Sequence, residues 1–342
     1  DLKKSLPNIR DSVKYVDALN RIAILFYEKN IDSTFSYTVK ARMIADRIRY
    51  EKGKADATNN IGIFSDIKGN LQLALRYYNE AHLSYTKLRD TSNQVQTIMN
   101  IAMVYKELGK DERSIEKYNN ALSLGKKLQH DSIMSLVIFN YLLQFPTHFD
   151  KRTKSNQIRK ASEIALRYND YRTHLALTQL RASEFIVNGE KERGIKLLDS
   201  VINVCLERKL FYVSMDMILD IGNQLQSTDP LRSLAYYQKG LSIANENGYL
   251  IYSKMLNRKL FEFHRAKNDF QQVNTYAAQL IDLVDQQEVL DLQSGVDYLD
   301  YALKEQEVES LVTKSSYQSL IILLSLIVGL LATAVAFSIG RN

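Results

Sequence analysis

The stretch ATNNIGIFSDIKGNLQLALRYYNEAHLSYTKL, residues 57–88, has the pattern of two helices joined by a turn. Its first half is rich in small and apolar residues, and Lys68-Gly69-Asn70 then interrupts the pattern with a turn signal. The pattern resumes at spacings of three and four, through Leu71, Ala74, Leu75, Tyr78 and Ala81. This is the period of an amphipathic helix. The stretch therefore predicts a helical hairpin.

The same hairpin recurs along the chain with a period of 40 residues. Steps of 40 from Gly62 reach Ala102, Leu142, Ala182 and Gly222, and steps through Ala81 reach Ala41, Ala121 and Ala161. Tyr78 falls on Tyr118 and, after a slip of one residue, on Tyr237, while Gly69 falls on Gly109 and Gly189. Small residues are expected where helices cross closely, an aromatic residue where the crossing leaves space, and glycine where the first helix ends. The chain is therefore a repeat protein.

The pattern resembles the tetratricopeptide repeat (TPR). The match is clear in Ile101-Ala102, Tyr105, Gly109, Tyr118 and Ala121. The resemblance implies an all-α fold, a right-handed solenoid of helical hairpins in which each repeat contacts only its neighbours. The usual TPR period is about 34 residues, so longer helices are expected here. The predicted pairs are 17–50, 57–89, 97–129, 132–168, 171–208, 211–247 and 250–287.

Composition agrees with a helical chain that has no long linker. Among 342 residues there are only 13 glycines and 3 prolines. The net charge of +6 comes from interspersed basic and acidic residues, without the continuous basic stripe that nucleic-acid binding requires. The single cysteine, Cys205, lies in an apolar run, which predicts a buried and inert thiol.

A column of asparagines on the first helices is the main functional signal. Asn60, Asn100 and Asn140 stand 40 residues apart, and asparagine gains little inside a helix. In the TPR family the first helices line a concave groove, and an asparagine at this position holds the backbone of an extended peptide. The alternative is that these amides bridge adjacent helices. The other residues predicted to line the groove are Asn59, Asp66, Lys106 and Gln179.

The repeat pattern fades after residue 287. Residues 288–318 predict a connecting or stalk helix, in which Leu292, Val296, Leu299 and Leu303 form a short apolar seam suited to homodimer formation. The alternative is a helix that only caps the last repeat. The predicted domains are a leader (1–16), the TPR solenoid (17–287), the stalk (288–318), a transmembrane helix (319–340) and the start of a cytoplasmic tail (341–342).

The transmembrane prediction rests on Leu320 to Ile339, twenty residues without a charge. A helix of this length spans roughly 30 Å, the thickness of a hydrocarbon core. The segment before it is acidic and Arg341 follows it, which favours repeats outside and a cytoplasmic C-terminus. The start at Asp1 without methionine is compatible with a removed signal peptide. These features predict a single-pass membrane protein whose TPR domain lies outside the cytoplasm.

No catalytic, cofactor-binding or metal-binding motif is visible. The five histidines fall in different repeats without a carboxylate or cysteine at a ligand spacing, and no phosphate-binding glycine loop occurs. The sequence therefore predicts a chain that is not an enzyme and binds no cofactor.

Repeats, a stalk and one span resemble the sensor half of Bacteroidetes-type membrane histidine kinases and transcriptional regulators that contain TPRs. The resemblance implies a single-pass protein of a bacterial inner membrane with a periplasmic TPR domain, which acts as a sensor that binds a peptide or protein in the groove. Small rotations between neighbouring repeats would then accumulate and reach the membrane span. This hypothesis expects the gene product to continue beyond Asn342 into an output domain. The alternative is a cytoplasmic TPR scaffold that is anchored to a membrane by its tail.

Overall fold

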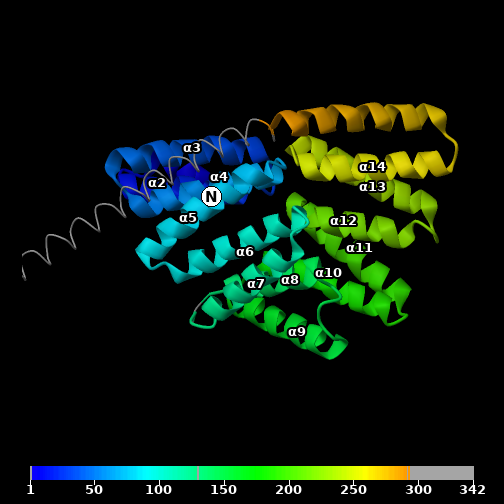
Figure 1. Cartoon of the computed structure of the whole chain (residues 1–342), viewed down its shortest axis with the longest axis horizontal. Helices are drawn as coiled ribbons and strands as arrows, with labels where there is room; N and C mark the ends of the chain where they lie inside the picture. The colour runs from blue at the N-terminus through cyan, green and yellow to red at the C-terminus, as the bar shows by residue number, and fades with distance from the viewer. Residues whose placement is uncertain (1, 129–130, 291, 293–342) are drawn as a thin grey trace, which may run out of the picture. The chain divides into compact units, whose positions relative to one another are not determined.

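The computed structural model describes residues 2–128, 131–290 and 292, and the regular structure in these residues is helical. A short α1 (Leu2–Ser5) and the 3-10 helix η1 (Leu6–Asn8) precede seven successive hairpins (Figure 1). The hairpins are α2 (Ser12–Phe26) with α3 (Ile31–Ile48), α4 (Glu51–Ile67) with α5 (Leu71–Leu88), α6 (Thr91–Glu107) with α7 (Asp111–Gly125), α8 (Ile133–Gln144) with α9 (Lys151–Arg167), α10 (Tyr171–Val187) with α11 (Lys191–Glu207), α12 (Phe211–Leu225) with α13 (Pro230–Asn247), and α14 (Leu250–Ala266) with the helical residues 270–290. The predicted all-α, TPR-like solenoid is confirmed.

The first three hairpins begin five or six residues earlier than the sequence pattern indicates. Helix α2 begins at Ser12, inside the predicted leader, because the Asp11 side chain accepts a hydrogen bond from the backbone N–H of Lys14 at 2.8 Å. Asp90 caps α6 in the same way through Asn93. Prediction from the small-residue columns missed these starts because the first turns are polar. The caps are the only signal at α2 and α6, and α4, which begins after Tyr50, has no side-chain cap.

The predicted packing columns are buried contacts between paired helices. Tyr78, Tyr118 and Tyr237 are at most 1% exposed. A Cβ atom added to Gly62 would lie 2.6 Å from the ring of Tyr78, and one added to Gly222 would lie 2.3 Å from the ring of Tyr237. The small residues are therefore required where the tyrosine rings press against the first helix.

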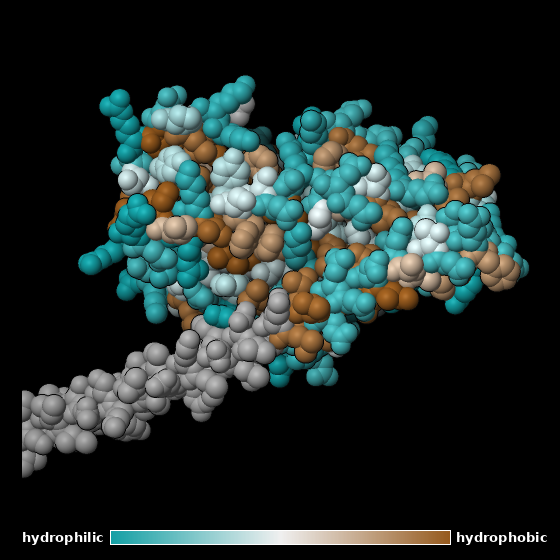
Figure 2. All heavy atoms as spheres, turned by 90° about the horizontal axis from the view of Figure 1, so that it is seen from above, coloured by the Kyte–Doolittle hydropathy of each residue, from teal (hydrophilic) through white to brown (hydrophobic). Residues whose placement is uncertain are grey.

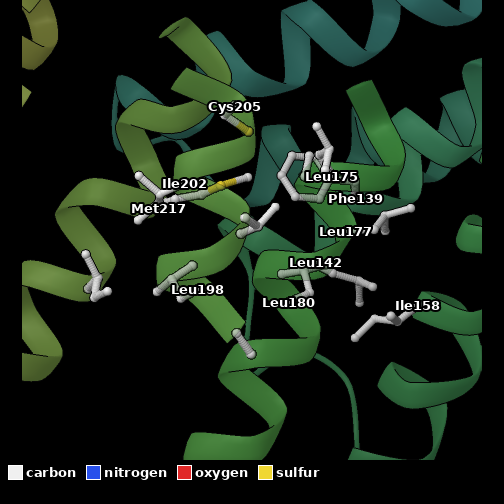
Figure 3. Packing of buried hydrophobic residues seen from close by; sticks show 14 of the residues in the cluster. Phe139, Leu142, Ile158, Leu175, Leu177, Leu180, Leu198, Ile202, Cys205 and Met217 are labelled. Atoms are coloured by element: carbon white, nitrogen blue, oxygen red, sulfur yellow. The ribbon is translucent and has the colours of Figure 1, made fainter. Parts of the chain in front are cut away.

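The largest core cluster joins helices α8 to α12 (Figure 3). Leu142, Leu177, Leu198 and Ile202 fill its centre, and Cys205 lies at its edge with no exposed surface. Burial raises the pKa of the Cys205 thiol to about 12, so the thiol stays protonated at neutral pH. The predicted buried, inert cysteine is confirmed.

The hairpins follow one another around a curve, with α4, α6, α8, α10 and α12 on its inner side (Figure 1). These first helices bury more residues than the second helices of the same hairpins, because they contact neighbours on more than one face. Side chains that point inward from several hairpins can therefore approach one another.

The first hairpins contact the last ones, so the expectation that each repeat touches only its neighbours is wrong. The Tyr249 hydroxyl donates to the carbonyl oxygen of Tyr27 at 2.8 Å, and the backbone N–H of Phe211 donates to the carbonyl oxygen of Glu28 at 3.2 Å. The Gln287 amide donates to the carbonyl oxygen of Gly69 at 2.6 Å. The curve therefore closes on itself.

The predicted membrane helix, 319–340, lies outside the described residues, as does the predicted stalk and dimer seam beyond Leu292. Within the part of the chain that the structure describes, no helix is both long and apolar enough to span a bilayer.

The described surface in Figure 2 is mostly hydrophilic, with smaller hydrophobic patches between the polar side chains. The most exposed large apolar side chains, Val187, Leu231 and Phe270, belong to three different hairpins. Scattered apolar residues of this kind are ordinary on a soluble surface and do not mark a binding site.

Candidate functional site

Three acidic side chains from separate hairpins meet on the inner side. Asp66 lies near the end of α4, Glu107 is the last residue of α6, and Asp216 lies in the second turn of α12. Burial, followed by repulsion from Asp66 and Asp216, holds the pKa of Glu107 well above its usual range. Glu107 is therefore within electrostatic reach of both Asp66 and Asp216, and the three carboxyl groups are here called the acid cluster.

The same environment acts on the other two members. Burial raises the pKa of Asp66 to about 7, although the Tyr78 hydroxyl donates to its Oδ2 at 3.1 Å and favours the ionised form. Burial also raises the pKa of Asp216, and Asp220 adds repulsion, while a hydrogen bond from Tyr252 acts in the opposite direction. In both residues, burial raises the pKa by more than the hydrogen bonds lower it.

The acid cluster has no basic partner among the described residues. The ion pairs in this part of the chain involve other carboxylates, and no lysine or arginine lowers the pKa of Asp66, Glu107 or Asp216. Asp66 and Glu107 also sit at helix C-termini, where the helix dipole disfavours negative charge. Enclosed carboxylates without partners are costly. The arrangement is therefore suited to a cationic group from outside the chain.

The carboxyl groups are enclosed and yet accessible. The side chain of Glu107 is exposed and those of Asp66 and Asp216 are partly exposed, while surrounding protein is the main cause of their raised pKa values. A side chain that contacts solvent and is also surrounded by protein on several sides lies on a concave surface. A ligand on the inner side can therefore reach them.

Tyrosines form the wall beside the acid cluster. The ring of Tyr212 meets those of Tyr27, Tyr249 and Tyr252 edge to face, with centroids 5.4, 5.3 and 5.6 Å apart. Burial, with the negative charges of Asp66, Glu107 and Asp216, holds the pKa of Tyr212 well above its usual range, so its hydroxyl remains a donor. Tyr27, Tyr249 and Tyr252 are at most 9% exposed, so the partly exposed Tyr212 is the tyrosine of this wall that a ligand can reach.

The predicted asparagine column divides into different roles. The Asn60 amide donates to the carbonyl oxygen of Asn20 at 3.2 Å and so bridges α4 and α2. The Asn140 amide donates to the carbonyl oxygen of Leu136 in its own helix at 3.0 Å and to Met99 Sδ of α6 at 3.5 Å. Asn100 is 7% exposed, and its side-chain nitrogen has no hydrogen-bond partner among the described residues. Helix bridging therefore describes Asn60 and, through a weaker contact with sulfur, Asn140, while Asn100 keeps a buried, unpaired donor.

The other predicted groove residues are also dispersed. Asp66 is a member of the acid cluster, and the buried Asn59 has a side-chain oxygen without a partner in the described part of the chain. Lys106 pairs with Asp111 at 3.0 Å and lies over the ring of Phe145. Gln179 is buried and hydrogen-bonds Asp220. The structure therefore brings only Asp66 into the cluster.

Sequence reasoning missed Glu107, Asp216, Tyr212 and Tyr252. Glu107 had one usable signal, because an acid at the end of a helix opposes the dipole. Tyr212 and Tyr252 stand 40 residues apart, at the same place in neighbouring hairpins, and this pair was a usable signal. Asp216 occupies no repeated column, and its approach to Glu107 follows from closure of the array, which a search for neighbouring repeats does not reveal.

Replacement of Asn60 and Asn100 by alanine should separate the two roles. We expect Asn60→Ala to lower the free energy of unfolding by about 1–2 kcal/mol, because it removes a buried hydrogen bond between helices. Asn100→Ala should change it by less than about 0.5 kcal/mol, since no bond is lost. Urea unfolding of both variants measures the difference. Equal losses would show that Asn100 also has a structural partner.

Comparison of the sequence with protein-family models and with curated proteins gives no match. Solved structures do match. A Rap protein complexed with competence and sporulation factor has a TM-score of 0.60 at 15% identity, covering 81% of this chain and 81% of that chain. The Rap conjugation gene regulator of plasmid pLS20, in complex with the Phr* peptide, has a TM-score of 0.62 at 14% identity, covering 81% and 74%.

Aspartyl phosphate phosphatase F from Bacillus subtilis has a TM-score of 0.54 at 13% identity, covering 70% of this chain and 62% of that chain. Likeness at such low identity concerns the fold and not the site. Together with the hairpins and the packing columns, these matches show that the chain is a TPR-like helical repeat protein.

Proposed function

We propose that this protein is a peptide-binding regulatory protein whose ligand lies along the inner side of the curve and places a basic group at the acid cluster. One observation carries the proposal. Three enclosed carboxyl groups from α4, α6 and α12 converge without a basic partner among the described residues. A lysine, an arginine or a free N-terminal amine of the ligand would supply the missing charge.

Two further observations support a peptide as the ligand. The partly exposed Tyr212 offers a ring and a hydroxyl donor beside the acid cluster, and a peptide presents both apolar side chains and carbonyl acceptors. The pLS20 regulator, similar in fold, was solved in complex with the Phr* peptide. We expect the Tyr212 wall to contact the apolar side chains of the ligand.

Binding of short synthetic peptides tests the proposal. A heptapeptide library on beads, with each position fixed in turn as arginine or as its neutral analogue citrulline, gives the preferred charge and position. We expect arginine to be enriched at one position. For a selected peptide, the double variant Glu107→Gln/Asp216→Asn should raise the dissociation constant at least about tenfold. This is the size of effect expected when a charge-assisted hydrogen bond is lost.

Asp111→Asn is the matched control, because Asp111 is exposed and pairs with Lys106. It removes a carboxylate of the same chain outside the acid cluster and should leave the affinity unchanged. Equal enrichment of arginine and citrulline at all positions would contradict a cationic ligand. Unchanged affinity in the double variant would place the peptide elsewhere.

We further propose that the protein is the periplasmic sensor part of a membrane signalling protein, with residues 319–340 as its span. The uncharged segment Leu320 to Ile339 and the acidic stretch before it support this topology. The alternative is a tail-anchored cytoplasmic scaffold. Single cysteines placed just before Leu320 and just after Ile339, probed in whole cells with a membrane-impermeant maleimide, separate the two. The sensor requires labelling of the first position only.

A further inference from the structure

The first hairpin supplies the cap that helix α12 lacks. Leu210, at the N-cap position of α12, has no side-chain group to offer the free N–H groups of the first turn. The Glu28 carbonyl oxygen instead accepts from the N–H of Phe211, and Glu28 Oε2 accepts from the N–H of Val213, both at 3.2 Å. Glu28 is only 3% exposed, so this contact is buried.

The same two residues, Tyr27 and Glu28, contact two other helices. Arg172 of α10 places a guanidinium nitrogen 3.5 Å from Glu28 Oε1, and its guanidinium carbon lies 5.1 Å from the centre of the Tyr27 ring. Tyr249, at the start of α14, donates to the Tyr27 carbonyl oxygen. A buried residue pair of the first hairpin therefore holds the starts of α10, α12 and α14.

Closure at this point also assembles the acid cluster. Tyr212, which packs on Tyr27, is one turn away from Asp216 on α12, whereas Asp66 and Glu107 come from α4 and α6. If α12 moved away from the first hairpin, Asp216 would leave the other two carboxyl groups. Closure therefore brings like charges together, and their repulsion opposes it.

We propose that Tyr27 and Glu28 form a latch that closes the solenoid into a ring, and that a ligand on the acid cluster favours the closed ring by relieving the repulsion across it. The second half of this inference rests on the proposed function. By linkage, the ligand then binds the closed ring more tightly than the open one. When the ligand dissociates, the latch opens more often, and this opening is the structural signal that the ligand is absent. The latch is a bistable contact between distant repeats, so it needs no rotation summed along the array.

Distances between spin labels test the latch without any ligand. Met43 on α3 and Met255 on α14 are exposed, and their replacement by cysteine gives one label on each side of the latch. Cys205 is the only native cysteine and is buried, so it takes no label. A second pair, Met43→Cys with Leu83→Cys, lies within the first two hairpins and serves as the control.

We expect a single narrow distance distribution between positions 43 and 255 in the otherwise wild-type chain. Glu28→Ala should add a longer-distance population, and Tyr249→Phe, which removes one hydroxyl, should add a smaller one. The control pair should not change. An unchanged distribution in both variants overturns the latch. If Glu28→Ala lowers the helical content measured by circular dichroism, Tyr249→Phe alone decides, since it keeps the ring and its packing.

A neutralised acid cluster tests the coupling separately. Asp216→Asn removes one of the repelling charges, as a cationic ligand would. Added to Glu28→Ala, it should reduce the longer-distance population at least twofold. An unchanged population would overturn the coupling while leaving the latch intact. Failure of peptide binding affects neither measurement, because no peptide is present.

Discussion

Replacement of Gly222 by leucine is expected to lower the free energy of unfolding by about 3 kcal/mol, as overpacking of a rigid contact does. A Cβ atom at this position would lie 2.3 Å from Cε1 and 2.8 Å from Cδ1 of Tyr237. The tyrosine ring cannot turn aside easily, because its hydroxyl donates to Asn223 Oδ1 at 2.8 Å and the residue is fully buried. Helices α12 and α13 would therefore have to separate.

Helix propensity alone predicts the opposite sign, a rise in the free energy of unfolding, so the measurement distinguishes the two effects. Glycine inside a helix costs about 1 kcal/mol relative to alanine, so a mutation without a steric penalty would stabilise α12. Lys239→Leu on the exposed face of α13 introduces the same side chain where it meets little protein. Urea unfolding followed by circular dichroism should show a change within about 0.5 kcal/mol for this control. A Gly222→Leu protein as stable as the control would show that the two helices are not in close contact there.

The hairpins were predictable because they repeat. Gly62 and Gly222, or Tyr78 and Tyr118, occupy equivalent places in different repeats, and each has a local steric reason to be small or aromatic. Such contacts involve residues close in sequence, so that periodicity alone reveals them. Helix starts were less predictable, since a polar first turn capped by Asp11 or Asp90 carries no periodic signal.

Closure of the array could not be predicted from repeat columns. Glu28 meets Phe211 and Val213, and Gln287 meets Gly69, across intervals that no repeat period describes. In the sequence, nothing distinguishes Glu28 from other polar residues that follow a helix. Its function as the cap of α12 depends on the accumulated curvature of five hairpins, which no single residue encodes.

The candidate site was partly predictable for the same reason. Asp66 was identified from its place on a first helix, and Asn60 from its column, although the Asn60 amide bridges two helices. Glu107 lies on the first helix of the neighbouring hairpin, whereas Asp216 of α12 joins these two residues only because the ring closes. The acid cluster is thus a product of tertiary structure, whereas the hairpins that carry it follow from local sequence.

The stability of the protein is expected to fall as pH rises from about 4 to 7, and Asp66 should be a main cause. Its pKa is about 7 in the folded chain, against an ordinary value of 3.8 for an aspartic acid side chain. The folded state therefore holds a proton that the unfolded state has already released. Stability from this group is fully present below pH 4 and is lost as pH rises through the folded pKa.

The groups that face Asp66 determine how large this effect is. The Tyr78 hydroxyl on α5 donates to it, whereas Glu107 on α6 repels it and is itself coupled to Asp216 on α12. Asp66→Asn removes the ionisation and also reduces the repulsion on Glu107. We expect the loss in free energy of unfolding between pH 5 and pH 7.5 to be about 2 kcal/mol smaller in Asp66→Asn than in the wild-type chain.

Urea unfolding of both proteins at the two pH values measures this difference. Glu163→Gln on α9 is the matched control, since Glu163 is exposed and its ion pair among the described residues is with Arg159. Its pH dependence should follow that of the wild-type chain. If Asp66→Asn keeps the wild-type dependence, the carboxyl group of Asp66 titrates freely in the folded protein and the acid cluster does not hold its charges together. If the dependence is lost, the repulsion that a cationic ligand would relieve is present in the ligand-free ring.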